Sequence, residues 1–254
     1  MDKSFRNATR VMNGATARLE KRLLVWMAGR LPACINSDHL TALAALAMMG
    51  AAGAYVWSRQ WPPALHLVNL CLLINWFGDS LDGTVARVRN QQRPRYGFYV
   101  DHVLDCAGIA LLVLGMAGSG LMSLTVGLAF LVAYFMVLIE VFLATYTLTS
   151  FRMSFMGCGP TELRILLAVG NLAALRGPVV TLFGDTWRLF DVGASVSIPM
   201  LVIAFLMAAV RNGRALFLAE PRSSTQSSRC DDSLPSSDAH RPPARTGIPH
   251  ESPA

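Results

Sequence analysis

Charged residues are scarce in this chain. Only 15% of its 254 residues are Asp, Glu, Lys or Arg, whereas 53% are hydrophobic, and soluble domains are usually about one quarter charged. Its long apolar stretches are apolar around the whole helix rather than along one stripe, which argues against a soluble helical protein. The sequence therefore predicts an all-α integral membrane protein with several spans, and no feature in it indicates binding to nucleic acid.

Metal-binding patterns built from cysteine or histidine are also missing. The five cysteines lie far apart and form no CxxC pair, and the five histidines show no metal-ligand spacing. Cysteine inside an apolar segment behaves as a small hydrophobic residue. These absences argue against a zinc site and against a disulfide framework.

Six segments are apolar and long enough to cross a membrane. In chain order they cover about 39–57, 64–88, 98 to the Gly-rich stretch at 115–120, 121–147, a segment that starts at 161, and 190–210. The fifth segment is interrupted by Arg176, Gly177 and Pro178. It is either a short helix with a long outer loop or a longer helix with a kink.

Three regions follow from composition. Residues 1–37 are basic and amphipathic, so a helix in the membrane interface is expected there; residues 38–218 form the six-helix membrane domain; and the Ser/Pro-rich residues 219–254 are expected to be disordered. Short loops rich in Lys and Arg place both termini on the cytoplasmic side of an inner or plasma membrane, where anionic lipids attract this basic face.

The stretch from Gly78 to Asp105 carries four aspartates between two apolar segments. On a helix, Asp79 and Asp82 share one face, and Asp101 and Asp105 share a face of the next helix. A short hairpin brings these carboxylates together at the cytoplasmic end, where uncompensated charge would be unfavourable. Oxygen ligands favour Mg²⁺ or Mn²⁺, and two such ions would balance the four charges.

Small residues accompany the aspartates. Gly83, Ala86 and Gly97 leave the helix surfaces flat, so that a bulky ligand can lie against the backbone. Arg87 stands one turn beyond Gly83 and suits a phosphate. Metals, a flat surface and an arginine together predict a site for a pyrophosphate-bearing substrate.

The pattern Asp79-x2-Asp82-Gly83-x2-Ala86-Arg87 … Gly97-x3-Asp101-x3-Asp105 resembles the signature of the CDP-alcohol phosphotransferases. All eight fixed positions match, although the nine residues between Arg87 and Gly97 make a slightly longer gap than is usual in that family. These are integral membrane enzymes of phospholipid synthesis. The resemblance implies transfer of a substituted phosphate from a CDP-alcohol to an acceptor hydroxyl with release of CMP, and a homodimer within the membrane.

The resemblance also implies roles for individual residues. Asp79, Asp82 and Asp101 would be metal ligands, and Asp105 would share in coordination and act as the base. The CDP moiety would be contacted by the small residues and the arginine of the signature, which are Gly83, Ala86, Arg87 and Gly97.

The donor and the acceptor are left open. Asp101-His102 resembles a pairing in choline and ethanolamine phosphotransferases, which use a CDP-aminoalcohol and diacylglycerol. The other branch uses CDP-diacylglycerol and a small alcohol such as glycerol phosphate, serine or inositol. His102 either indicates that the enzyme belongs to the first branch or only hydrogen-bonds within the hairpin.

Four further residues are candidates for the substrate pocket. Glu140 is an ionisable group at membrane depth, either functional or an internally paired structural acid. Glu162 and Arg164 either line the pocket or serve as a helix-start charge and an interfacial anchor, and pocket-lining is favoured. Asn75 either binds ligand or satisfies a helix contact.

A divalent-cation transporter or channel is the alternative from a different class, because acidic clusters in membrane helices also mark ion pathways. It would explain the four aspartates. It would not explain Gly83, Ala86 and Arg87 on the same stripe, and it would place acids near the bilayer midplane rather than at one end. The enzyme is therefore preferred.

Overall fold

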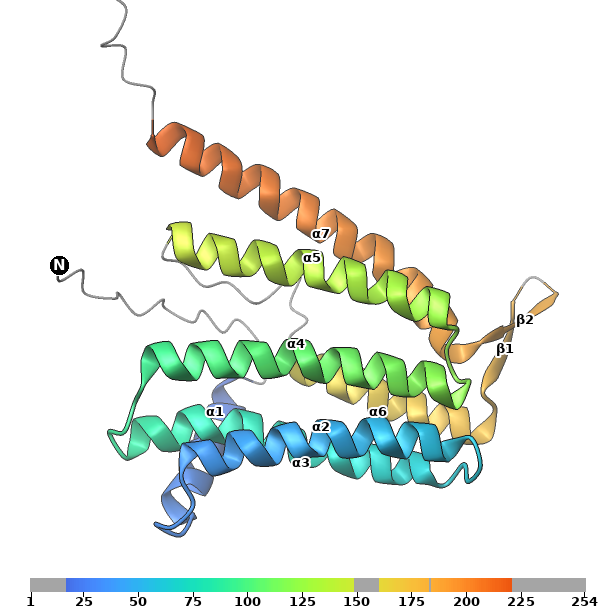
Figure 1. The fold of residues 1–254 in the computed structure, drawn as a ribbon, viewed down its shortest axis with the longest axis horizontal. Helices are drawn as coiled ribbons and strands as arrows, with labels where there is room; N and C mark the ends of the chain where they lie inside the picture. The colour runs from blue at the N-terminus through green and yellow to red at the C-terminus, as the bar shows by residue number, and fades with distance from the viewer. Residues whose placement is uncertain (1–16, 149–159, 183, 221–254) are drawn as a thin grey trace, which may run out of the picture.

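The computed structural model describes residues 17–148, 160–182 and 184–220 (Figure 1). The elements in these ranges are α1 (Ala17–Arg30), α2 (Ser37–Ser58), α3 (Ala64–Val88), α4 (Pro94–Ser119), α5 (Leu124–Leu148), α6 (Pro160–Arg176), β1 (Val179–Leu182), β2 (Asp185–Arg188) and α7 (Leu189–Ala219). The first 16 residues, the loop 149–159, and all of the predicted disordered tail except Ala219 and Glu220 lie outside the described residues.

Five of the described helices, α2, α3, α4, α5 and α7, are long and apolar enough to cross a membrane. This confirms an all-α integral membrane protein. The second predicted span matches α3 at both ends, whereas α7 continues to Ala219, beyond the predicted end near residue 210. Helix α6 has only 17 residues, or about 25 Å at 1.5 Å per residue, near the lower limit for a span. That α6 is a sixth span stays a prediction.

The interrupted fifth segment is a short helix, not a kinked one. Helix α6 ends at Arg176, and the chain then forms an antiparallel hairpin in which Val179 faces Arg188 and Leu182 faces Asp185. The backbone N–H of Leu189 donates to the Pro178 carbonyl at 2.9 Å and closes the base of the hairpin. This hairpin was not predicted from the sequence: β-branched and aromatic residues flank a glycine there, but each strand has only four residues.

Helix α2 packs against both α3 and α4, α6 packs on α3, and α5 pairs with α7 (Figure 1). Two glycines allow α2 to lie close to its neighbours. A Cβ atom at Gly78 would lie 2.6 Å from the Leu40 carbonyl oxygen, and one at Gly115 would lie 2.7 Å from the Ala52 carbonyl oxygen. Small residues at such contacts are typical of membrane helix packing.

Helix α1 packs on α3 through the buried side chains of Leu24 and Ala28, while Trp26 is exposed. The Arg89 guanidinium, at the end of α3, binds the segment that connects α1 to α2. It donates to the backbone carbonyls of Leu31 (2.9 Å), Pro32 (3.0 Å) and Ile35 (2.6 Å). That α1 lies in the membrane interface stays a prediction.

Candidate active site

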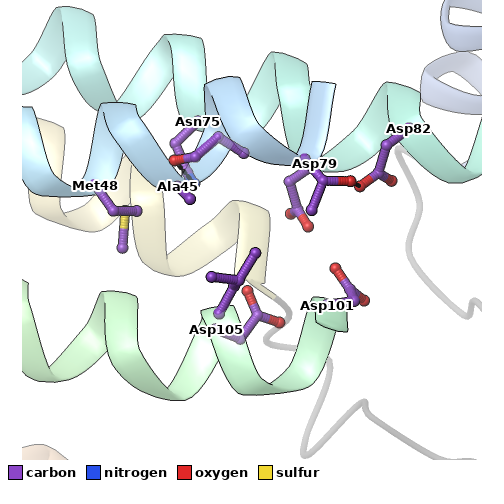
Figure 2. A pocket seen from close by; sticks show the side chains of 10 residues that line it. Ala45, Met48, Asn75, Asp79, Asp82, Asp101 and Asp105 are labelled. Atoms are coloured by element: carbon purple, nitrogen blue, oxygen red, sulfur yellow. Dashed lines mark hydrogen bonds between the residues drawn. The ribbon is translucent and has the colours of Figure 1, made fainter. Parts of the chain in front are cut away.

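Asp79 of α3 faces Asp101 and Asp105 of α4, and Asp82 lies one turn further along α3 (Figure 2). Carboxylate oxygens of Asp79, Asp101 and Asp105 lie within 4.8 Å of one another, and all three residues are partly exposed. These three and Asp82 line one pocket. Its other lining residues come from α2, α3 and α4 and are Thr41, Ala44, Ala45, Met48, Asn75 and Leu104.

Asp82 is oriented differently from the other three aspartates. Its Oδ2 atom accepts a hydrogen bond of 2.7 Å from the Thr41 hydroxyl of α2, and its Oδ1 atom accepts one from the backbone N–H of Gly83. Asp82 therefore borders the pocket with both carboxylate oxygens already accepting hydrogen bonds. The sequence analysis missed Thr41, because only the packing of α2 on α3 brings together two residues that are 41 positions apart.

Arg164 of α6 contacts the aspartate site through α3. Its Nε donates to Asn75 Oδ1 at 2.8 Å, and an Nη atom donates to Asp79 Oδ2 at 2.7 Å. Asn75 in turn donates from Nδ2 to the Ala44 carbonyl of α2 at 3.1 Å. The predicted candidates Asn75 and Arg164 are thus both joined to the site, whereas Glu162 is exposed in the first turn of α6.

The small residues of the signature continue α3 and begin α4 outside the lining of the pocket. A Cβ atom at Gly97 would meet no heavy atom of the structure within 4 Å, and one at Gly83 would meet only the Arg87 guanidinium, at 3.4 Å. The exposed Arg87 donates to the Thr84 hydroxyl at 3.0 Å, and Ala86 is partly exposed. These residues leave an open surface beside the aspartates.

Two predicted pocket residues, His102 and Glu140, do not line the pocket. The buried His102 ring stacks on Phe98 at 4.0 Å between ring centroids, meets Phe142 of α5 edge-on at 5.1 Å, and places Nδ1 2.7 Å from the Phe98 carbonyl oxygen. Glu140 is buried and accepts a hydrogen bond of 2.6 Å from Asn212, which links α5 to α7. The structure therefore gives His102 contacts within α4 and with α5, with its Nδ1 3.8 Å from an Asp101 carboxylate oxygen, and gives Glu140 a partner on α7.

The aspartates fit a divalent cation. One oxygen from each of Asp79, Asp101 and Asp105 can approach a common point, since these atoms lie within 4.8 Å of one another. Ligands that are all carboxylate oxygens suit hard cations such as Mg²⁺ and Mn²⁺. The triad could therefore hold one metal ion, with Asp82 close by.

Two comparisons with known proteins bear on this site. A comparison with curated proteins gives no match. A family model described as CDP-alcohol phosphatidyltransferase matches residues 35–210, a range that holds α2 to α6, most of α7 and all four aspartates. The matched range is more than half of the chain, and it includes the whole pocket. The chain therefore belongs to the CDP-alcohol phosphatidyltransferase family, whose members are transferases of phospholipid synthesis that act on CDP-alcohols.

Proposed function

We propose that this protein is a membrane-embedded phosphotransferase that moves the substituted phosphate of a CDP-alcohol to an acceptor hydroxyl and releases CMP. The observation that carries the proposal is the meeting of carboxylate oxygens from Asp79, Asp101 and Asp105 within 4.8 Å, at one end of the helices. Together with family membership, this geometry favours phosphoryl transfer, in which positioning and charge stabilisation supply most of the catalysis.

Asp105 is the proposed base. Its carboxylate takes the proton from the acceptor hydroxyl as that oxygen attacks the β-phosphorus of the CDP-alcohol. The bond between the β-phosphorus and the bridging oxygen breaks, and CMP leaves with that oxygen. The new phosphodiester keeps the alcohol that the donor carried.

Asp79, Asp82 and Asp101 are the proposed metal ligands, with Asp105 sharing in coordination. Mg²⁺ or Mn²⁺ is proposed, with two ions to match four carboxylates. When bound, such ions neutralise charge on the pyrophosphate. Thr41 holds one oxygen of Asp82 at 2.7 Å, so this carboxylate is oriented before any cation arrives.

The CDP moiety is proposed to lie on the open surface formed by Gly83, Ala86, Arg87 and Gly97. The absence of neighbouring atoms around a Cβ built at Gly97 supports close approach of a ligand to the α4 backbone in the described part of the site. The exposed Arg87 guanidinium can bind a phosphate oxygen.

The donor is proposed to be either CDP-diacylglycerol with a small alcohol acceptor or a CDP-aminoalcohol with diacylglycerol. Arg164 and Asn75 are the proposed pocket residues with the strongest support, because both bond to the aspartate site. Glu162 stays a candidate at the start of α6. His102 and Glu140 have less support, since their bonds lie within α4 and between α5 and α7.

The catalytic domain is proposed to cover residues 38–218, which the family match over 35–210 supports. The basic loops support a topology with the active site and both termini in the cytoplasm. A homodimer in the membrane belongs to the same proposal, and the mass of the protein in native lipid particles would test it.

CMP release by the purified protein in lipid nanodiscs tests the reaction. One panel supplies CDP-choline or CDP-ethanolamine with diacylglycerol, and the other supplies CDP-diacylglycerol with glycerol phosphate, serine or inositol. Release in one panel is expected with Mg²⁺ or Mn²⁺ and none with EDTA. Asp105→Asn should abolish release, whereas Asp185→Asn, on the hairpin, should retain it. Absence of CMP in both panels with either metal would contradict the proposal, and Mn²⁺ flux into proteoliposomes would then favour a transporter.

A further inference from the structure

Three polar side chains form a hydrogen-bonded cluster that the proposed chemistry does not use. Tyr55 of α2 donates from its hydroxyl to Asn171 Oδ1 at 2.9 Å, and Asn171 Nδ2 donates to Asn69 Oδ1 of α3 at 2.8 Å. Asn69 then donates to the Ala168 carbonyl of α6 at 3.3 Å. Tyr55 and Asn171 are both 0% exposed. Asn69 is partly exposed. We call these three residues, Tyr55, Asn69 and Asn171, the inner polar cluster.

The cluster lies on the same face of α6 as Arg164. Asn171 follows Arg164 by seven residues, which is close to two full turns of helix. On α3 the partners run in the opposite direction, with Asn69 opposite Asn171, and Asn75 and Asp79 opposite Arg164. The two helices are therefore joined by polar contacts at two levels, one at the aspartates and one about 10 Å away along α6.

The face of α6 turned to the core packs through Leu163, Leu167 and Ala174, and the polar contacts add directional bonds that fix how far α6 slides along α3. Its other face is apolar and exposed, with Ile165 at 58%, Leu166 at 65% and Val169 at 57%. In a bilayer such side chains are surrounded by lipid tails that are as apolar as themselves, so they give no preferred register, and polar contacts between helices do. A slip of one residue would move Arg164 by about 1.5 Å and rotate it by about 100°. Bonds of 2.8 and 2.7 Å to Asn75 and Asp79 would not survive it.

We propose that Asn69 and Asn171 are positioning residues that set the register of α6 on α3, and so hold the Arg164 guanidinium against Asp79. The inference rests on the proposed function for its catalytic consequence, because Asp79 matters there as a metal ligand. Its structural part concerns contacts within this chain and can be measured without turnover.

Two variants perturb the cluster from opposite helices. Asn171→Leu removes the amide from α6, and Asn69→Ala removes its partner from α3. The matched control is Tyr55→Phe, which deletes a hydrogen bond in the same buried place but leaves both bonds between α3 and α6. A merely structural role would make the three variants alike, since each leaves a buried polar atom without its partner.

The first readout is binding of Mn²⁺ by electron paramagnetic resonance, with Arg164→Ala as the reference. Asn171→Leu and Asn69→Ala should each shift the Mn²⁺ dissociation constant at least about threefold, in the same direction as Arg164→Ala. When either Asn substitution is combined with Arg164→Ala, the Mn²⁺ dissociation constant should not shift further than in Arg164→Ala alone. Tyr55→Phe should stay within about twofold of the parent protein. Parent-like Mn²⁺ binding in the Asn variants, or shifts that add in the double variants, would overturn the proposal.

The second readout is the melting temperature without metal. Asn171 and Arg164 share no hydrogen-bond partner, so independent effects would add. If Asn171 acts through Arg164, the double variant should lose less than the sum of the single losses, by at least about 3 °C on the scale expected for a domain of this size. Additive losses would contradict the inference. A parent protein that binds Mn²⁺ but releases no CMP would overturn the proposed function, while both readouts would still decide the role of Asn69 and Asn171.

Discussion

Replacement of Gly78 by alanine tests whether the close contact of α2 and α3 builds the site. A Cβ atom there would lie 2.6 Å from the Leu40 carbonyl oxygen and 3.0 Å from the Ala44 Cβ. Carbon–oxygen contacts between packed helices are about 3.3–3.6 Å, so the two helices must separate locally by roughly 0.7–1.0 Å. Overpacking of this kind costs about 1–3 kcal/mol in the free energy of unfolding.

The same displacement acts on Asp82, one turn further along α3. The Thr41–Asp82 hydrogen bond is 2.7 Å long, and a separation of about 0.7 Å stretches it beyond the usual range for O–H···O bonds. A hydrogen bond to a charged group contributes about 1.5–3 kcal/mol, and each 1.36 kcal/mol is tenfold. We therefore expect Gly78→Ala to lower kcat/KM for CMP release by about 10- to 150-fold, and to weaken Mn²⁺ binding.

Two other glycines provide matched controls. Gly115→Ala introduces a similar clash, 2.7 Å from the Ala52 carbonyl oxygen, but far along α4 from its aspartates. It should lower the melting temperature as Gly78→Ala does while it leaves Mn²⁺ affinity unchanged. Gly53→Ala meets no atom of the structure within 4 Å and should be neutral or stabilising by up to about 1 kcal/mol. Parent-like turnover in Gly78→Ala, or equal loss of Mn²⁺ binding in Gly115→Ala, would refute the reasoning.

Substitutions at three further residues have definite expected outcomes. Thr41→Val keeps the size of the side chain but removes its hydrogen bond to Asp82, so initial rates should give a kcat/KM lower by about tenfold or more, and the melting temperature should fall by about 3–12 °C. Glu140→Gln still offers an oxygen to Asn212, so its turnover should stay within about threefold of the parent protein. Glu140→Leu removes that oxygen and should lower the melting temperature. A large loss of turnover in Glu140→Gln would instead support a catalytic role for Glu140. Arg93→Ala breaks an ion pair with Asp38 whose side chains are 56% and 55% exposed; it should cost less than about 1 kcal/mol in thermal unfolding, and a greater loss would show that the pair is shielded from solvent.

The sequence was informative wherever a pattern is local. The ends of α3 at Ala64 and Val88, and the shared face of Asp79 and Asp82, follow from hydrophobicity and helical periodicity along one segment. The grouping of α3 and α4 carboxylates follows only in part, since a short connection joins the two helices but α2, which packs on both, holds them together.

Contacts between distant segments were not predictable in this way. Thr41 and Asp82, or Asn171 and Asn69, are ordinary residues in their own helices, and only the packing of α2 and α6 on α3 pairs them. The sequence alone allowed Glu140 to be catalytic or paired, and its partner Asn212 lies 72 residues away. The β hairpin was missed for a different reason, since four-residue strands give too short a pattern to stand out between two apolar helices.

The ion pair between Arg164 and Asp79 has a consequence for the order of events during biosynthesis. The two residues are 85 positions apart, and chains grow at about 5–20 residues per second, so Asp79 is made roughly 4–17 s before its arginine. Helices α3 and α4 precede α6 in the chain, so all four aspartates are made before Arg164. During that interval water at the membrane surface or a cation must compensate the charge of Asp79. Arrival of α6 then ends the need for this temporary compensation at Asp79.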